Sequence, residues 1–287
     1  MCRFFCCQCF CLIYAVLLLP TQIQCCHPEG RAPREVIHLP SEEESFSYEE
    51  LERWGGQCQT GQRQSPIDIR KEWFDENKTP PIRFVNYEKQ HSVKMHNNGH
   101  TVEVDGFDTW PERPFITDGG LGSSRYLLTQ FHFHWSQNGD GSEHTVNGQH
   151  FDAELHLVHI KEGLTTEEAL RTPDGFAVVG IFYKTAFIGR PLVALQNGLS
   201  QVTKTDDSVQ IDNCMLSVLL PTDLNSFFRY NGSLTTPDCN EAVVWSVYEV
   251  PRFNNAELIQ LLRTIQGEDG KLIRTNVRPV QTFSRRA

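Results

Sequence analysis

Three histidines stand where they could bind one metal ion. His132 and His134 alternate with aromatic residues in Gln130–Trp135 (QFHFHW), and His156 lies within Glu154–His159 (ELHLVH). Side chains two residues apart on a β-strand point to the same face. If the two segments are neighbouring strands, the three imidazoles meet. Three neutral histidines with one open position are typical of a catalytic rather than a structural Zn²⁺ site.

Two polar residues precede these histidines on the same strand faces. Gln130 stands two positions before His132, and Glu154 stands two positions before His156. Each is placed to accept a hydrogen bond from a ring nitrogen and so to fix the ring's orientation. An isolated His-x-His pair is more often a surface or core feature. The third histidine and the aromatic residues behind the pair favour the metal site. The neighbouring histidines are expected to be structural or surface residues: His144, His150 and His159.

Short apolar or alternating segments dominate the chain after residue 46 and predict the strands that would carry these residues. The expected strands are Ile82–Tyr87, Ser92–His96, Thr101–Phe107, Arg125–Trp135, Phe151–Ile160, Phe176–Lys184, Met215–Leu220 and Ala242–Val250. Helices are fewer: a capping box begins one at Thr165, Pro191 opens a second, and Asn255–Gln266 has one apolar face. Strands from end to end without a linker indicate one mainly-β domain with peripheral helices (α+β) over residues 46–283.

The N-terminus has the pattern of a secretory signal peptide, which we place at residues 1–26. Its apolar run, Phe10–Leu19, is closed by Pro20. That run is shorter than the roughly 20 apolar residues that a membrane span needs. An uncleaved anchor is the alternative interpretation. Residues 27–45 are polar, contain proline and end in an acidic run, so we expect a flexible leader.

Charge and cysteine content narrow the class of protein. The 287 residues carry a formal net charge of −10, which disfavours nucleic acid as a partner. Seven of the ten cysteines lie within the signal peptide, which leaves Cys58, Cys214 and Cys239. In an oxidising compartment two should pair and one should remain. The mature chain has no second long apolar segment, so we expect no membrane span and a secreted, extracellular protein.

Several segments together resemble the α-class carbonic anhydrases of the secreted type. They are Gln62–Ile69, Asn97–His100, Gln130–Trp135, Gly141–Val146, Glu154–His159, Gly232–Pro237 and Asn276–Pro279. The similarity runs from about Tyr48 to Pro279. It implies a single domain around a large, mostly antiparallel, twisted central sheet of about ten strands. It also implies zinc-dependent, reversible hydration of carbon dioxide to bicarbonate and a proton, by attack of zinc-bound hydroxide, with a role in pH regulation.

The resemblance assigns a role to individual residues. His132, His134 and His156 would hold the zinc ion, and Gln130, Glu154 and Asn276 would orient them. Thr235, held by Glu143, would orient the nucleophile, and His100 would shuttle protons. The implied substrate-binding residues are Val158, Val178, Leu234, Thr235, Thr236, Val243 and Trp245, and the implied proton path is lined by Tyr48, Asn98 and Glu103. Glu103 replaces an amide common in the family, and its carboxylate would raise the shuttle's pKa or disturb the water chain.

The resemblance also bears on covalent features. Cys58 and Cys239 match the two ends of the disulfide of secreted members, so Cys214 is the odd thiol. It would be either buried or available for pairing two chains into a dimer. Two Asn-x-Ser/Thr sequences make Asn77 and Asn231 candidate glycosylation sites. Asn77, in a polar loop, is the better candidate, because Asn231 stands close to the segment that carries Thr235.

Two further hypotheses compete with an active enzyme. One is a catalytically weak relative that serves as a secreted binding protein, a class in which zinc histidines are typically lost. The other is a mineral-matrix protein whose acidic residues gather calcium, for which the run Ser41–Glu44 is thin support. The complete set of three histidines favours the enzyme.

Overall fold

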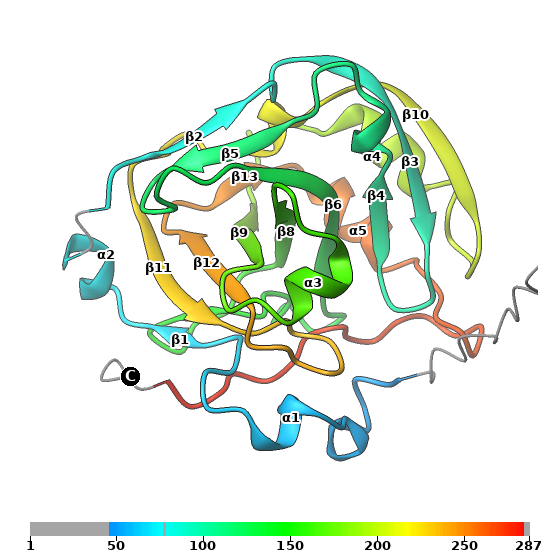
Figure 1. The fold of residues 1–287 in the computed structure, drawn as a ribbon. Coiled ribbons are helices and arrows are strands. Elements are labelled where there is room, and N and C mark those ends of the chain that lie inside the picture. Colours follow the sequence, from blue (N-terminus) through cyan, green and yellow to red (C-terminus); the bar gives the residue numbers. More distant parts are fainter. Residues whose placement is uncertain (1–45, 77–78, 284–287) are drawn as a thin grey trace, which may run out of the picture. The chain divides into compact units, whose positions relative to one another are not determined.

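The computed structural model describes residues 46–76 and 79–283 (Figure 1). The expected signal peptide (1–26), the leader (27–45) and Asn77 lie outside the described residues. Among the described residues, no helix has the length and apolar character needed to cross a membrane.

A large twisted sheet carries the rest of the structure (Figure 1). Within the described residues it has eleven strands: β2 (Ile82–Val85), β3 (Gln90–Asn97), β4 (Val102–Asp105), β5 (Phe115–Asp118), β6 (Tyr126–Trp135), β8 (Ala153–Lys161), β9 (Phe176–Thr185), β10 (Ser208–Met215), β11 (Phe227–Gly232), β12 (Val243–Tyr248) and β13 (Arg252–Asn254). The order along the sheet is β10-β3-β4-β6-β8-β9-β12-β11, with β5 beside β6, β2 beside β5 and β13 beside β9. The described parallel pairs of this sheet are β9 with β12 and β9 with β13, and its other described pairs are antiparallel. The expected fold class is therefore confirmed.

The helices are short and surround the sheet (Figure 1). They are α1 (Gln57–Thr60), α2 (Glu72–Glu76), α3 (Thr166–Leu170), α4 (Val193–Leu199) and α5 (Ala256–Leu262), with 3₁₀ turns η1 (Leu51–Arg53), η2 (Phe107–Thr109) and η3 (Leu216–Leu219). A separate pair, β1 (Asp68–Ile69) and β7 (Thr145–Val146), forms a small parallel sheet. The predicted capping box is confirmed, because the Thr165 side chain accepts a bond from the Glu168 N–H and Glu168 bonds back to Thr165.

One predicted strand is wrong. The segment predicted as a strand at Met215–Leu220 contains only the last residue of β10 and continues as η3. Leu216 and Leu219 are both buried and stand three residues apart, a spacing that places them on one side of a 3₁₀ turn. A short apolar run is ambiguous between strand and turn in the sequence.

Both faces of the central strands are buried, because each face has its own apolar cluster. In β6, Phe131 and Phe133 are fully buried in one cluster, and the alternating histidines point to the other side. In β8, Leu155 and Leu157 join the first cluster, and Val158 joins the second. The alternation predicted from the sequence is therefore the alternation of the fold.

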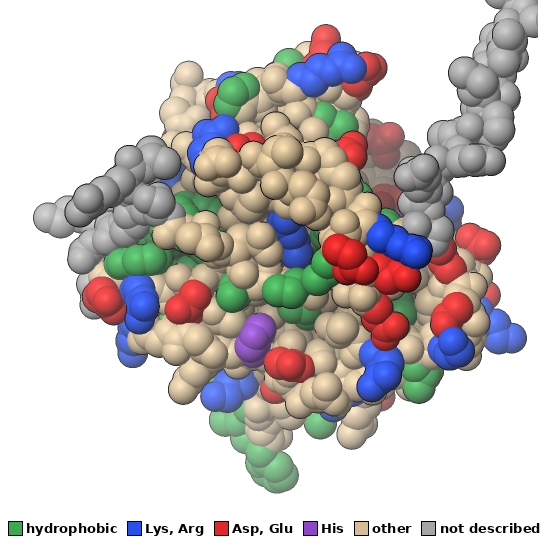
Figure 2. Space-filling model, turned by 90° about the horizontal axis from the view of Figure 1, so that it is seen from below, with side chains coloured by type: hydrophobic (Ala, Val, Ile, Leu, Met, Phe, Trp, Pro, Cys, Tyr) green, Lys and Arg blue, Asp and Glu red, His purple; other side chains and the backbone are tan. Residues whose placement is uncertain are grey.

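On the surface seen in Figure 2, acidic and basic side chains are interspersed.

His159 lies on the face of β8 that points away from the three histidines. It is fully buried, with Nδ1 3.0 Å from the carbonyl oxygen of Ala177 and Nε2 2.6 Å from the Tyr87 hydroxyl. A carbonyl only accepts, so Nδ1 carries the hydrogen and Nε2 accepts from Tyr87. Burial lowers the pKa of His159 to about 3. Of the two roles considered for it, the structure supports the structural one.

The variant His159→Gln should weaken the acid sensitivity of the fold. The unfolded chain takes up a proton at His159 below a pH of about 6.5. The folded chain does so only near 3. Within that window the unfolded state binds more protons, so the free energy of unfolding falls as pH falls, by about 1.4 kcal/mol per pH unit for this residue.

Urea unfolding between pH 6.5 and 5.0 measures this slope. His159→Gln should show a shallower slope than the parent, and His150→Gln, at an exposed histidine, serves as the matched control. Equal slopes in the parent and His159→Gln would contradict the assignment.

Candidate metal centre

The structure brings His132, His134 and His156 to one point. Strands β6 and β8 are antiparallel neighbours, and His132 stands directly opposite His156. One ring nitrogen from each histidine lies within 4.8 Å of the others, and the Nε2 atoms of His132 and His134 are 3.1 Å apart. This is the geometry predicted from the spacing alone.

The outer nitrogen of each ring has an acceptor. Nδ1 of His132 lies 2.8 Å from Oε1 of Gln130, and Nε2 of His156 lies 2.8 Å from Oε1 of Glu154. Nδ1 of His134 lies 2.7 Å from the backbone oxygen of Asn276. Acceptors fix the hydrogen on the outer nitrogens, so the inner nitrogens present three lone pairs to one another. Such lone pairs repel unless a cation lies between them, and the donor set therefore fits a metal ion.

The three rings are neutral at physiological pH. Burial lowers the pKa of each, that of His134 to about 3 and that of His132 well below its ordinary value. The neutral imidazole is the form that binds metals. Imidazole nitrogens suit several transition metals, zinc among them, and three histidines with an open position are typical of catalytic zinc sites.

Glu154 is a buried carboxylate shared by two histidines. It accepts bonds from the backbone N–H of His144 at 2.8 Å, from His144 Nδ1 at 2.7 Å and from His156 Nε2 at 2.8 Å. Burial alone would raise the pKa of Glu154, but the two histidines beside it hold that pKa well below its ordinary value. A Cβ at Gly180, on β9, would lie 3.0 Å from Oε1, so the glycine leaves room for this group.

His144 is linked more closely to the three histidines than its sequence context indicated. It is fully buried, and its Nε2 lies 2.6 Å from the Tyr230 hydroxyl while Nδ1 bonds to Glu154. It therefore links the carboxylate that orients His156 to strand β11. The signal in the sequence was only its position within Gly141–Val146.

Glu143 faces the three histidines from another side. Its Oε1 accepts the Arg278 backbone N–H at 2.9 Å, and its Oε2 lies 3.5 Å from His134 Nε2 and 3.9 Å from His156 Nδ1. Burial raises the pKa of Glu143 well above its ordinary value, although hydrogen bonds from the Thr235 side chain and the Arg278 backbone act in the opposite direction. Thr235 is itself buried, and its side chain bonds to Glu143.

An apolar wall lies beside the histidines. Val158, Val178 and Trp245 stand opposite one another across β8, β9 and β12. The ring centroids of Trp245 and His156 are 4.7 Å apart. The wall consists of Val158, Val178, Leu234, Val243 and Trp245, which all belong to one cluster or pack on it. Of the expected substrate-binding residues, Thr236 is outside this cluster and half-buried.

The loop Gly232–Pro237, which carries Thr235, is held at its base. Ser65 is the central contact: its Oγ accepts from the Tyr230 hydroxyl at 2.8 Å and from the Ser233 N–H at 3.0 Å. Its carbonyl accepts from Arg278 Nη1 at 2.6 Å. Sequence reasoning assigned no role to Ser65, Tyr230 or Arg278 because their contacts join distant segments.

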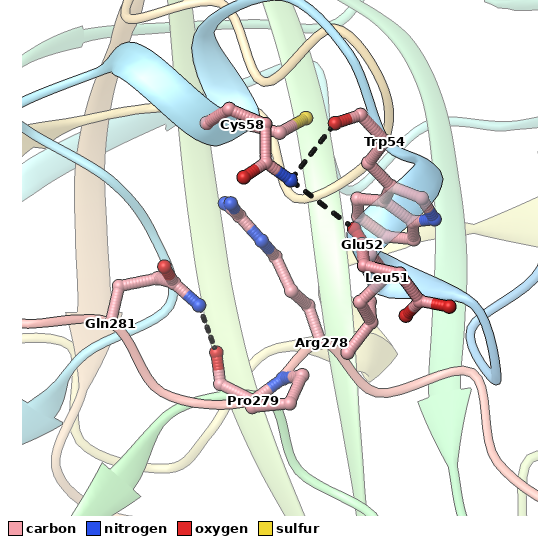
Figure 3. Close-up of a pocket in the computed structure, with 8 residues that line it drawn as sticks. Leu51, Glu52, Trp54, Cys58, Arg278, Pro279 and Gln281 are labelled. Carbon is pink, nitrogen blue, oxygen red and sulfur yellow. Dashed lines mark hydrogen bonds between the residues drawn. The ribbon is translucent and has the colours of Figure 1, made fainter.

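The end of this loop is tied to the N-terminal segment. The structure contains the expected disulfide between Cys58 and Cys239, and the Gln57 N–H donates to the Asp238 carbonyl at 3.0 Å. A pocket beside the disulfide is drawn in Figure 3, where the Arg278 side chain extends toward Cys58. This pocket does not include the three histidines.

Two possibilities were considered for the unpaired Cys214, a buried thiol or one available for dimerisation, and the structure shows a buried thiol. Its side chain is 4% exposed, and burial raises the pKa of its thiol to about 12. A thiol in this position is neither accessible nor reactive, so a dimer through Cys214 is not supported.

His100 is partly exposed and contacts residues from three other segments. Its ring stacks on Phe46 at a centroid distance of 3.9 Å, and Nε2 lies 3.4 Å from Oε1 of Glu268. Asn98 shapes the turn, since its Oδ1 accepts the His100 N–H at 3.0 Å. Asn276 donates from Nδ2 to the His100 carbonyl at 3.2 Å, so one residue contacts both His100 and His134.

Glu103 stands between two histidines on neighbouring strands. It is opposite His132 of β6 and opposite His96 of β3. Burial and the charge of Asp105 raise the pKa of Glu103 to about 7. The carboxyl group is therefore about half protonated at neutral pH. Tyr48, also expected on the proton path, contacts Phe46 and Trp54 by ring edges, and burial raises the pKa of its phenol well above the ordinary value.

Asn231 lies on β11 opposite Val244, and its side chain is exposed. The predicted glycosylation of Asn231 and Asn77 stays a prediction.

Comparisons with known proteins agree on one family. The family model described as eukaryotic-type carbonic anhydrase matches residues 49–287. Putative carbonic anhydrase 5 of Caenorhabditis elegans is 38% identical over 254 residues, which cover 86% of this chain and 82% of that protein. Carbonic anhydrase 4 of Mus musculus is 34% identical, with 82% and 77% covered, and carbonic anhydrase 7 of Homo sapiens is 40% identical, with 67% and 72% covered.

The variant Glu154→Gln should bind zinc more weakly. The amide keeps the size of the side chain but removes the charge that orients His156 and balances the cation. Loss of such an outer partner typically lowers metal affinity by about 10- to 100-fold. Competition with a chromophoric chelator measures the change, and Glu168→Gln on the exposed helix α3 is the matched control. Unchanged affinity in Glu154→Gln would contradict the role assigned to this carboxylate.

Proposed function

This chain belongs to the eukaryotic-type carbonic anhydrase family, and we propose that it hydrates carbon dioxide reversibly to bicarbonate and a proton. The observation that carries the proposal is the convergence of His132, His134 and His156, each with its outer nitrogen bonded to an acceptor. Family members in which this function is lost would be expected to lack part of such a set.

Zinc is the metal we propose for this centre, held by the three inner ring nitrogens. When bound, zinc would act as a Lewis acid and lower the pKa of a coordinated water molecule. The buried Glu154 carboxylate supports the proposal, because its charge requires a nearby cation and its bonds fix His144 and His156.

Thr235 and Glu143 are proposed to orient the nucleophile. The Thr235 hydroxyl donates its hydrogen toward Glu143, so the hydroxyl oxygen is left to accept a hydrogen bond from the nucleophile. A single fixed acceptor allows one orientation, which aims the nucleophile's lone pair at the substrate. This preorganisation lowers the barrier because the group need not reorient during reaction.

The apolar wall is proposed to receive carbon dioxide, a molecule without charge. Val158 and Val178 lie on the strands next to the metal ligands, and Trp245 packs against His156. Apolar side chains exclude water from this side of the site and hold an apolar substrate without competing hydrogen bonds. Bicarbonate, which is charged, would bind the same surface poorly and leave.

His100 is proposed to carry the proton to solvent. An imidazole changes charge near neutral pH and so can both accept and release a proton. Glu268, 3.4 Å away, would stabilise the protonated ring. Glu103 adds a carboxyl group beside the path and is the main departure from the family pattern.

Secretion is proposed on the basis of the disulfide. A bond between Cys58 and Cys239 persists in oxidising compartments and is rare in the cytosol.

Stopped-flow measurement of carbon dioxide hydration by the purified, zinc-loaded chain tests the function. We expect hydration above the buffer rate that an aromatic sulfonamide abolishes. Thr235→Val should lower kcat/KM by about 10²-fold, the usual effect of removing one orienting group. Thr264→Val, at an exposed threonine, is the matched control. A folded, zinc-loaded chain with no rate above buffer would overturn the proposal in favour of a binding protein.

His100→Ala should lower kcat at low buffer concentration by at least about tenfold while leaving kcat/KM for carbon dioxide unchanged. The shuttle acts only after the substrate is converted, and imidazole added to the buffer should restore the lost rate. His150→Ala tests for a general effect of losing a histidine. A fall in kcat that imidazole does not rescue would argue against a shuttle.

A further inference from the structure

We propose that Arg229, Ser246 and Tyr248 form a binding site for a small planar oxyanion of the carboxylate or bicarbonate class. The site lies on the face of the sheet opposite the metal centre, and the inference does not depend on the proposed catalytic function.

The three residues share one face of two neighbouring strands. Strands β11 and β12 pair antiparallel, with Arg229 opposite Ser246 and Phe227 opposite Tyr248. Directly opposed side chains lie on the same face, as do residues two apart on one strand. The next residues along, Tyr230 and Trp245, belong to the cluster beside the metal centre, so Arg229 and Ser246 point the other way.

The polar atoms of this group are buried and have no partner among the residues that the structure describes. This holds for Nε, Nη1 and Nη2 of Arg229, for Oγ of Ser246 and for Oη of Tyr248. A guanidinium has five N–H donors, and each hydroxyl adds one. Buried donors are nearly always satisfied in folded proteins, so a cluster of them in one place indicates a missing acceptor.

The charge of Arg229 also lacks a counter-ion. Across residues 46–76 and 79–283, its guanidinium forms no ion pair, and its described contact is with the ring of Phe227, 5.4 Å from the centroid. Two carboxylates act on tyrosines that Arg229 also influences: Asp174 on Tyr126 and Asp223 on Tyr248. Asp174 is paired with Lys161 at 2.6 Å, and neither carboxylate forms a described ion pair with Arg229. An isolated buried charge is costly, and binding an anion removes that cost.

The three groups are all donors at neutral pH. Burial lowers the pKa of Arg229 to about 10, so its guanidinium remains charged. Burial raises the pKa of Tyr248, with Asp223 adding to the effect and Arg229 opposing it, so its phenol keeps the hydrogen. The site therefore offers one positive charge, which forms no ion pair among the described residues, and two hydroxyls that can each donate a hydrogen bond. The charge favours an anion over a cation.

The geometry of the donors selects the anion. A guanidinium presents two parallel N–H groups that match the two oxygens of a planar oxyanion. The hydroxyls of Ser246 and Tyr248 can serve the remaining lone pairs. A single negative charge balances Arg229, whereas a doubly charged phosphate or sulfate would leave a buried excess charge. Space at the tip is limited, since a Cβ at Gly120 would lie 3.9 Å from Nη1.

Thermal unfolding of the zinc-loaded chain tests the proposal. Bicarbonate, formate, sulfate and chloride are compared at equal ionic strength, with saturating aromatic sulfonamide present to block anions at the metal centre. Sulfate stabilises folded proteins in general, so its shift should be the same in the parent and in Arg229→Met. We expect bicarbonate and formate to raise Tm of the parent above its value in chloride. Arg229→Met should lose this anion-dependent shift, and Arg171→Met, at an exposed arginine on the end of α3, should keep it.

An equal shift with bicarbonate or formate in the parent and Arg229→Met would overturn the proposal. So would the absence of any shift in the parent, which would mean that water satisfies the donors. If Arg229→Met does not fold, Ser246→Ala provides the second variant: a weaker apparent affinity for formate supports the site, and an unchanged one overturns it. Stability rather than turnover is measured, so an inactive enzyme would leave the result interpretable.

Discussion

The charge of Glu154 is the constraint on which the centre of the molecule depends. A carboxylate with no exposed surface stays ionised where N–H donors or nearby positive charge compensate for lost water. Three N–H groups from His144 and His156 supply the donors. Gly180 supplies the space, and Tyr230 holds His144 in place. A metal ion held by the three histidines would therefore also help to balance the buried negative charge of Glu154.

Because side chains alternate between the two faces of the sheet, one set of buried polar groups lies on each face. On one face, histidines and carboxylates form a network in which nearly every atom has a partner. On the other face, behind β11 and β12, the Arg229 guanidinium and two hydroxyls have no described hydrogen-bond partner. Both arrangements depend on strands buried on both sides, where an unsatisfied group is expensive. Both proposed ligand sites therefore lie at buried polar groups, whereas His159 is buried but satisfied by protein groups alone.

The triad could be predicted from the sequence because it depends on strand alternation, a local property of QFHFHW and ELHLVH. Gln130 and Glu154 could be predicted for the same reason. Asn276, whose backbone oxygen orients His134, could be predicted only from the family resemblance, because a carbonyl has no sequence signature and Asn276 is 142 residues away. His144 was underestimated because its partners lie on other strands. The 3₁₀ turn η3 was mistaken for a strand because short apolar runs fit both.

The pairing of His132 with His156 also determines where the chain can change in length. Side chains alternate with a period of two, so a single residue inserted between His132 and His134 would send one of these ligands to the opposite face. The bulge between Leu128 and Gln130 shows that the same strand pair accommodates an irregularity ahead of the ligands. The segment between β8 and β9, which contains α3 and lies at the surface, is free of that restriction. In sequences derived from this one, residues would be gained or lost in the loops. The spacing of the histidines within β6 and β8 would stay constant.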